Sequence, residues 1–400
     1  MTEIILKNIA LNAENEQFKT TANSLLGNHL LITGTTGSGK STSALSILTA
    51  LKRNNQNTII IDATGEYKNI ENATVAKLGE NAFIDYTKLD NNTWANLLTL
   101  NKPKEIKVLA AAILSLKIQK NVYKKDGIYS KINRKWTDFK KDSYQLFNYP
   151  QPFNINLLGQ QISEELIKPK LDETMNLEVI GQERDFKKLA KWQTRLQQIN
   201  NTLSDPIIAN IFHLPDHLAT HNNVRFDIMY LIALFSTHKV VNKTLVIDIS
   251  KVLPIVNLDQ KIVSIIANEV LSVKNKNNKR PVVLFIDEAH RYIPNKNKKI
   301  SENNGVYKIL REGRKVGTYL LLTTQSPLDI PTKLLGQFGA TLTHKIKTNT
   351  ELKRLKIKIP TIISYQPGQA LLQGDNYAKV YELQMIKSDE QHATNSPKFS

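Results

Sequence analysis

Residues 34–42 read GTTGSGKST, after the apolar run LLI at 30–32 and before the stretch SALSIL at 43–48. A strand, a glycine-rich turn and a helix in this order are what a phosphate-binding loop requires. Glycines at positions 34, 37 and 39 allow the backbone to curl, so that successive N–H groups face one concavity. The positive end of the dipole of the following helix lies at the same place. The stretch therefore predicts a site for a nucleoside triphosphate within an α/β fold.

Each residue of this loop is a candidate for contact with the nucleotide. The set is Gly34, Thr35, Thr36, Gly37, Ser38, Gly39, Lys40, Ser41 and Thr42. In such a loop the Lys40 ammonium group reaches the β- and γ-phosphates, and the Ser41 hydroxyl takes one position around Mg²⁺. The alternative is a glycine turn that binds nothing, and the apolar strand before the turn and the helix after it argue against that alternative.

The bulk composition is that of a globular protein, with 41% hydrophobic and 22% charged residues. No apolar run approaches the roughly 20 residues that a membrane span needs. The acid-containing N-terminal stretch MTEIILKNIALNAENEQ is not typical of a secretory signal. The absence of cysteine excludes disulfides and thiolate metal sites. These features favour a cytoplasmic protein.

The chain is strongly basic, with 54 Lys and Arg against 36 Asp and Glu and a formal charge of +18. Such a charge favours a polyanionic partner such as DNA. Lys and Asn are abundant throughout the chain, however, so a compositional bias explains the charge as well. The segment 117–141 mixes Lys and Arg with Tyr123, Tyr129 and Trp136. This mixture is compatible with nucleic-acid contact and with a solvated basic surface.

Five short apolar runs, at 29–33, 58–62, 244–249, 281–287 and 318–323, have the continuous hydrophobicity of strands in a parallel sheet that helices cover on both faces. Later strands are expected at 341–347, 369–374 and 378–385, in part antiparallel. The predicted organisation is a short N-terminal segment at 1–29, an α/β core at 30–90 and 240–386, a mainly helical insertion at 91–239 and a disordered tail at 387–400.

A second motif, VVLFIDEAH at 282–290, delivers two adjacent carboxylates to the end of a buried strand. With the phosphate loop upstream, Asp287 is predicted to hold Mg²⁺ through water and Glu288 to polarise the attacking water. The alternative is a strand that simply ends in acids. The string DEAH suggests a superfamily-two helicase, but the long separation between Lys40 and Asp287 argues against that class. Signature sequences of ABC ATPases and GTPases are absent from the sequence.

A third segment, GVYKILREGRKVGTYLLLTTQ at 305–325, predicts a helix and then a buried strand. Gln325 at the tip of this strand is a candidate sensor of the γ-phosphate. Arg311 and Arg314 are three residues apart and share one helical face. They are candidates for an arginine that stabilises transition-state charge in a neighbouring subunit. Capping of the helix end explains them equally well.

Seven ordered motifs resemble those of the HerA branch of the FtsK–HerA ring ATPases. They lie at 36–41 (TGSGKS), 62–67 (DATGEY), 247–250 (IDIS), 286–290 (IDEAH), 313–317 (GRKVG), 324–327 (TQSP) and 368–374 (GQALLQG). The resemblance implies a RecA-like P-loop NTPase core of the DUF87-like type that uses ATP and Mg²⁺. It further implies a hexameric ring on double-stranded DNA, with a nuclease or other effector as partner, in DNA processing or anti-phage defence. It makes Arg314 the leading arginine acting in trans, with Arg311 second.

Two features depart from the family pattern. About 28 residues precede the first core strand, too few for the β-barrel that usually opens this family. The arginine common on the strand after the TQ motif is replaced by the stretch THKIK at 343–347. A second hypothesis needs the same ATP site and is also kept, in which an ATP-gated oligomeric scaffold organises and activates a partner enzyme without translocating DNA.

Overall fold

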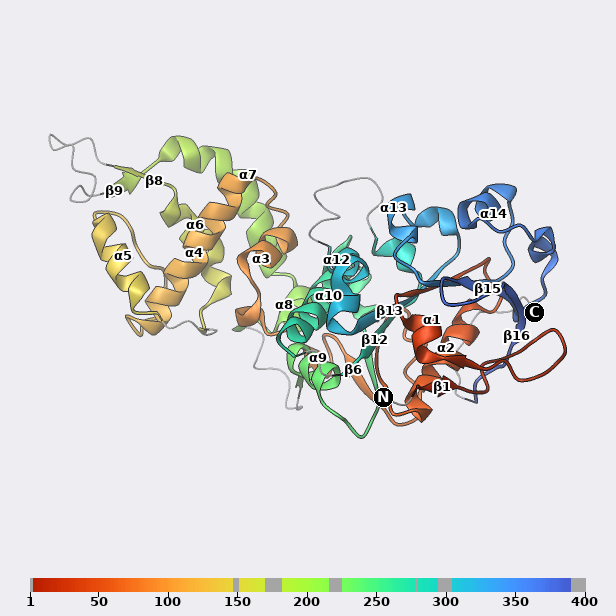
Figure 1. The fold of residues 1–400 in the computed structure, drawn as a ribbon. Coiled ribbons are helices and arrows are strands. Elements are labelled where there is room, and N and C mark those ends of the chain that lie inside the picture. The colour runs from red at the N-terminus through yellow and green to blue at the C-terminus, as the bar shows by residue number, and fades with distance from the viewer. Residues whose placement is uncertain are drawn as a thin grey trace, which may run out of the picture. The chain divides into compact units, whose positions relative to one another are not determined.

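The computed structural model describes residues 3–146, 151–169, 182–215, 225–277, 280–293 and 304–389 (Figure 1). The chain divides into two compact units, a core unit of residues 1–78 and 228–400 and a helical unit of residues 79–227. These divisions lie at 78/79 and 227/228, whereas the sequence analysis placed them at 90/91 and 239/240. Most of the predicted tail at 387–400 lies outside the described residues.

The core unit is built around one large sheet. Its described elements, with η marking 3-10 turns, are β1 (Ile5–Leu6), β2 (Ala10–Leu11), β3 (Thr20–Thr21), α1 (Ala22–Leu26), β4 (Leu30–Thr33), α2 (Lys40–Arg53), β5 (Asn57–Asp62), β6 (Ala73–Lys77), α9 (Ile228–Thr237), β11 (Thr244–Asp248), η4 (Ser250–Val252), α10 (Leu258–Lys276), β12 (Val282–Ile286), η5 (Ala289–Arg291), α12 (Gly305–Glu312), η6 (Gly313–Val316), β13 (Thr318–Thr324), η7 (Pro327–Asp329), α13 (Thr332–Leu335), β14 (Ala340–Thr343), α14 (Asn349–Leu355), η8 (Pro360–Ser364), β15 (Gln369–Gly374) and β16 (Tyr381–Met385).

The strand order of this sheet is β2-β16-β15-β14-β4-β13-β12-β5-β11-β6. The strands from β14 to β6 are parallel, whereas β15, β16 and β2 add in antiparallel fashion. The five predicted parallel strands and the partly antiparallel C-terminal part are thus confirmed. The strand predicted at 341–347 ends earlier, at Thr343, and β6 was not predicted.

Helices cover both faces of the sheet. Every residue of β4 and β5 is buried, as the continuous apolar runs predicted. On one face α1 and α2 pack against the strands, and Leu45 and Leu48 join a core with Ile32, Phe285 and Leu321. Helices α9, α10 and α12 lie on the other face, where they contact β5, β11 and β13 (Figure 1). Because helices cover both faces of the sheet, the loops that carry the predicted functional residues lie at the ends of the strands.

The helical unit contains mainly helices in its described part. Its elements are β7 (Ala82–Phe83), η1 (Tyr86–Lys88), α3 (Asn91–Leu97), α4 (Pro103–Asn121), α5 (Trp136–Tyr144), η2 (Ile155–Leu157), α6 (Leu158–Glu165), β8 (Ile167–Pro169), β9 (Gln182–Arg184), α7 (Phe186–Leu203), α8 (Pro206–Phe212) and β10 (Phe226–Asp227). Across the described parts of both units, we find no helix with the length and apolar character needed to cross a lipid bilayer.

Several groups that the sequence analysis considered for DNA contact lie inside the helical unit. Tyr129 is fully buried, and its hydroxyl donates to Asp142. The Arg134 guanidinium lies 4.3 Å from the centre of the Tyr129 ring and 3.4 Å from the Asp142 carboxylate. Lys131 is buried and pairs with Glu165. These side chains therefore stabilise the helical unit itself, and a DNA-contact role for the 117–141 segment stays a prediction for its exposed lysines.

His344 ties the phosphate loop to the C-terminal strands. Its fully buried ring has Nδ1 2.9 Å from the carbonyl oxygen of Gln369 and Nε2 3.0 Å from the Ser43 hydroxyl of α2. A carbonyl only accepts, so Nδ1 carries the proton and Nε2 accepts from Ser43. A Cβ at Gly34 would lie 2.6 Å from the His344 Cβ, which shows how closely the two segments approach. Burial lowers the pKa of His344 to about 4.

This pKa has a consequence for acid stability. The unfolded chain takes up a proton on His344 below the usual pKa of 6.5, whereas the folded chain does not until the pH falls to about 4. His344 therefore contributes to the free energy of unfolding in full above its pKa in the unfolded chain, 6.5. This contribution, about 3 kcal/mol in all, is lost as the pH falls from there to the pKa of the folded chain, about 4. In urea unfolding from about pH 7 to about pH 4.5, the variant His344→Gln is expected to lose less free energy of unfolding than the wild type.

The matched control is His238→Gln, which removes an exposed histidine of the same unit. An identical dependence of the unfolding free energy on pH in His344→Gln and the wild type would contradict the assignment.

Candidate functional site

The candidate site lies at one edge of the sheet, where three neighbouring parallel strands end. Strand β13 lies between β4 and β12, so its tip at Thr323–Gln325 separates the phosphate loop from the two acids after β12. The register pairs Thr33 with Thr324 and Ile286 with Leu322, so β4 and β13 end together and β12 ends two residues earlier, at the same edge of the sheet. Carboxyl ends of parallel strands are where α/β sheets bind ligands.

The loop after β4 has the backbone conformation of an anion site. Gly37 and Gly39 adopt φ values of 75° and 108°, which favour glycine over any residue with a Cβ. No described residue accepts a hydrogen bond from the backbone N–H groups of Gly37, Gly39, Lys40 or Ser41. Unsatisfied N–H groups at the start of a helix fit a phosphate group.

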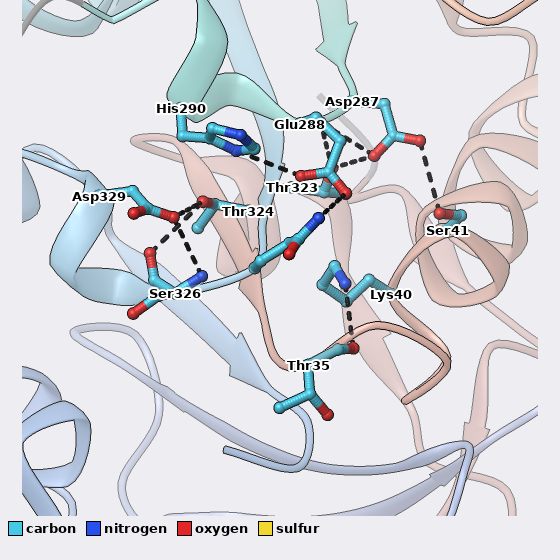
Figure 2. Close-up of polar contacts among 11 residues, drawn as sticks. Thr35, Lys40, Ser41, Asp287, Glu288, His290, Thr323, Thr324, Ser326 and Asp329 are labelled. Atoms are coloured by element: carbon cyan, nitrogen blue, oxygen red, sulfur yellow. Dashed lines mark hydrogen bonds and ion pairs between the residues drawn. The ribbon is translucent and has the colours of Figure 1, made fainter. Parts of the chain in front are cut away.

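Lys40 lies over this loop. Its ammonium group donates to the carbonyl oxygen of Thr35 at 3.1 Å (Figure 2). Lys40 is almost fully buried. Burial lowers the pKa of Lys40, and the charges of Glu288 and Asp287 oppose that shift. Among the described residues, one neutral acceptor thus holds the lysine within reach of the concavity, and a phosphate oxygen can replace that acceptor.

Asp287 is surrounded by hydrogen-bond donors. One carboxylate oxygen, Oδ1, accepts from the Thr323 hydroxyl and from the Glu288 backbone N–H. The other, Oδ2, accepts from the Tyr67 hydroxyl at 2.8 Å and from the Ser41 hydroxyl at 3.4 Å. Figure 2 shows Asp287 facing Ser41 across the site. The two residues predicted to hold Mg²⁺ therefore lie together, and an oxygen donor set of this kind fits Mg²⁺.

Glu288 has an unusual backbone conformation, with φ 50° and ψ 51° in the left-handed region. Its Oε1 accepts from the Gln325 amide at 3.3 Å, and its Oε2 lies 3.2 Å from Nδ1 of His290 (Figure 2). Left-handed conformations cost energy for a residue such as glutamate and cluster at functional sites. The structure thus brings the predicted water-polarising acid and the predicted sensor into direct contact.

The turn after β13 is stabilised by a separate polar network. Asp329 accepts from the Thr324 hydroxyl at 2.9 Å and from the Ser326 backbone N–H at 3.2 Å, as Figure 2 shows. The Ser326 hydroxyl donates in turn to Glu351 of α14 at 2.6 Å. These bonds fix the backbone on both sides of Gln325 and so determine where its amide points.

The structure does not bring Arg311 and Arg314 to the phosphate loop of their own chain. Both are exposed, and they lie just before β13 begins at Thr318. Strands β13 and β4 are parallel, so the arginines lie at the edge where these strands begin and the loop lies where they end. A strand of seven residues at roughly 3.3 Å each puts about 20 Å between the two edges, beyond the reach of an arginine.

Sequence reasoning assigned no role to Tyr67 or to His344. The ring of Tyr67 is fully buried, and the motif at 62–67 was noted without a role for it. His344 was noted only as a departure from the expected arginine. The sequence does show an aromatic residue at the end of the 62–67 motif and a histidine after the TQ motif. The hydrogen-bond partners of these two side chains, however, lie far away in the sequence.

Comparisons with known families agree with this architecture. The model for the central domain of helicase HerA (DUF87) matches residues 10–270, and the HerA-like C-terminal model matches residues 267–367. A probable DNA double-strand break repair helicase HerA from Methanocaldococcus jannaschii is 23% identical over 354 residues. That alignment covers 84% of this chain and 65% of the relative, so the chain spans a little under two thirds of the relative's length.

Solved structures show the same fold. VirB4 of Thermoanaerobacter pseudethanolicus has a TM-score of 0.60 at 13% identity, with 97% of each chain covered. The plasmid coupling protein TrwB, in a complex with ADP and Mg²⁺, has a TM-score of 0.54 at 13% identity, with 99% of this chain and 97% of that chain covered. The predicted RecA-like P-loop core is confirmed by this likeness. Since the central-domain model alone matches more than half of the residues, the chain belongs to the HerA family.

Proposed function

We propose that this protein is an ATPase that uses ATP and Mg²⁺ to drive translocation on double-stranded DNA. The observation that carries the proposal is the set of N–H groups at the start of α2 that donate to no described residue and lie with Lys40, Asp287 and Glu288 at one sheet edge. Family membership and the nucleotide complex of TrwB support it. A phosphate cradle and a pair of acids thus lie at one sheet edge, and hydrolysis of ATP uses both.

In this proposal each side chain has a separate task. The loop 34–42 holds the triphosphate through its backbone, and Lys40 exchanges its bond to Thr35 for the β- and γ-phosphates. Ser41 and Asp287 hold Mg²⁺, which when bound neutralises charge on the phosphates. Glu288 accepts a hydrogen bond from the attacking water and orients it.

Gln325 links binding to hydrolysis in this scheme. Its amide now donates to Glu288, the group that must be free to orient water. When the amide turns to a γ-phosphate oxygen, it leaves the Glu288 carboxylate available. The long 3.3 Å bond and the strained Glu288 backbone favour such an exchange over a permanent pair.

We further propose that the chain works as a ring, with the hexamer as its assembly. Arg311 and Arg314 lie at the sheet edge opposite their own phosphate loop and are exposed, which supports contact between neighbouring copies. An arginine in that position can complete a site only in a neighbouring copy. A nuclease or other effector as partner, and a role in DNA processing or anti-phage defence, are proposed from the family resemblance alone.

Replacing Glu288 tests the hydrolytic assignment. The variant Glu288→Gln keeps the shape of the side chain but removes its charge, so ATP turnover is expected to fall by roughly 100-fold or more while nucleotide binding persists. Phosphate release and fluorescence titration with an ATP analogue measure the two quantities. Glu16→Gln, which alters an exposed acid far along the chain, is the control. Turnover close to that of the wild type would remove Glu288 from the mechanism.

Mixing two inactive variants tests whether Arg314 acts in trans. Alone, Arg314→Ala is expected to lose about 10³-fold or more in turnover, since such arginines stabilise transition-state charge. Mixed with Lys40→Ala, it is expected to regain activity, because intact loops then meet intact arginines across some interfaces. A mixture of Lys40→Ala with Glu288→Gln is the control, since both changes damage the same half of the site. The absence of recovery in the first mixture would argue that the arginine has no role between subunits.

The response of ATP turnover to duplex DNA distinguishes the proposed motor from the second candidate function, an ATP-gated scaffold. A motor is expected to hydrolyse ATP several-fold faster with duplex DNA, and the gain is expected to decline with added salt as phosphate contacts are screened. Turnover measured with and without linear duplex, over a salt series, checks this. If turnover ignores duplex DNA, the scaffold that activates a partner enzyme becomes the better description.

A further inference from the structure

The loop after β5 is organised by one buried carboxylate. Asp62 is fully buried, and its Oδ1 accepts from the backbone N–H groups of Thr64, Gly65 and Glu66 at 3.1, 2.8 and 3.2 Å. Its Oδ2 accepts from the N–H of Tyr67 at 2.9 Å. Four backbone donors on one carboxylate fix the path of the loop, because any other path leaves a buried charge without partners.

The conformation of this loop determines the position of the Tyr67 side chain. The ring packs edge-on against Phe285 of β12, with centroids 5.4 Å apart and an interplanar angle of 77°. The hydroxyl donates to Oδ2 of Asp287, two residues after Phe285, at 2.8 Å. Strand β5 is the neighbour of β12, so the loop crosses from the end of one strand to the acid at the end of the next.

We propose that Tyr67 is a positioning residue that holds the Asp287 carboxylate in the orientation that binds Mg²⁺, with Asp62 as the anchor of the loop that carries it. This inference rests on the proposed function, because it assumes that Asp287 and Ser41 hold the metal. Tyr67 touches neither nucleotide nor metal in this scheme and acts through Asp287 alone.

The hydrogen bonds of Asp287 explain why a tyrosine is needed. Ser41 also donates to Oδ2, but at the long distance of 3.4 Å. Tyr67 donates at 2.8 Å and so makes the shorter of these two hydrogen bonds to Oδ2, while Thr323 holds Oδ1. The full burial of Tyr67 prevents water from replacing its hydroxyl. Loss of that donor leaves Oδ2 more weakly held, so the carboxylate is oriented mainly through the donors to Oδ1, Thr323 and the Glu288 N–H.

The test is the Mg²⁺ dependence of nucleotide binding in Tyr67→Phe. A fluorescent ADP derivative is titrated into the full chain, once with excess Mg²⁺ and once with EDTA. The variant keeps the ring and its packing on Phe285, so affinity in EDTA is expected to equal that of the wild type. The Mg²⁺ concentration that gives half-maximal tightening is expected to rise about tenfold, the usual cost of losing an outer-shell partner.

Tyr292→Phe is the matched control. Tyr292 is also a buried tyrosine, and no described residue accepts or donates a hydrogen bond at its hydroxyl. Removing that hydroxyl is expected to leave the Mg²⁺ dependence unchanged. Thermal unfolding of both variants checks that each is folded.

The possible results distinguish a failure of the proposed metal site from a failure of the positioning role of Tyr67. A wild-type chain that binds the ADP derivative without any effect of Mg²⁺ would count against the metal site of the proposed function. A wild-type chain that responds to Mg²⁺, with Tyr67→Phe responding identically, would overturn the positioning role alone. Equal weakening of binding with and without Mg²⁺ in Tyr67→Phe would also overturn it, since a general structural defect has that signature.

Discussion

The candidate site depends on backbone N–H groups around the start of α2 that donate to no described residue. An anion can use these groups only while the loop keeps its open conformation, so the segments around the loop must hold that conformation. The supports come from distant parts of the chain. Lys345 accepts from the N–H of Thr35, Gly368 donates its N–H to Ser38, and His344 accepts from Ser43. The C-terminal strands are therefore part of the nucleotide site, although none of their side chains needs to touch phosphate.

The chemistry of the site follows from the order of strands in the sheet. Because β13 lies between β4 and β12, its last residues contact both the phosphate loop and the two acids. Thr323 binds Asp287, and Gln325 binds Glu288, so one strand tip restrains both carboxylates. Strand β5, on the far side of β12, adds Tyr67 to the same Asp287. Residues at or just after the ends of four strands thus surround two acids. The register of the parallel sheet determines how far along the sheet each strand end lies.

The separation of the arginines from the phosphate loop has a simple origin. A helix that precedes a parallel strand ends at the edge where strands begin, whereas ligand loops follow the strands at the opposite edge. Arg311 lies in the last turn of α12 and Arg314 in η6, both before β13 begins, so the fold keeps them at the edge opposite the phosphate loop of the same chain. Close packing holds this helix in place. A Cβ on Gly305 would meet the Ser264 carbonyl oxygen of α10 at 2.3 Å, which allows only glycine at that contact.

The sequence alone determined the class of fold, the positions of five parallel strands and the residues that meet at their ends. It could do so because apolar runs, glycines and acids at strand ends are local patterns, each of which lies within a short stretch of the chain. It did not determine the division of the chain at 78/79 and 227/228, the internal role of Arg134 and Lys131, or the partners of Tyr67 and His344. Each of these depends on contacts between residues that strand order and register bring together. Only the tertiary structure decided that Tyr67 reaches Asp287, because the two are neighbours through adjacent strands rather than through any local pattern.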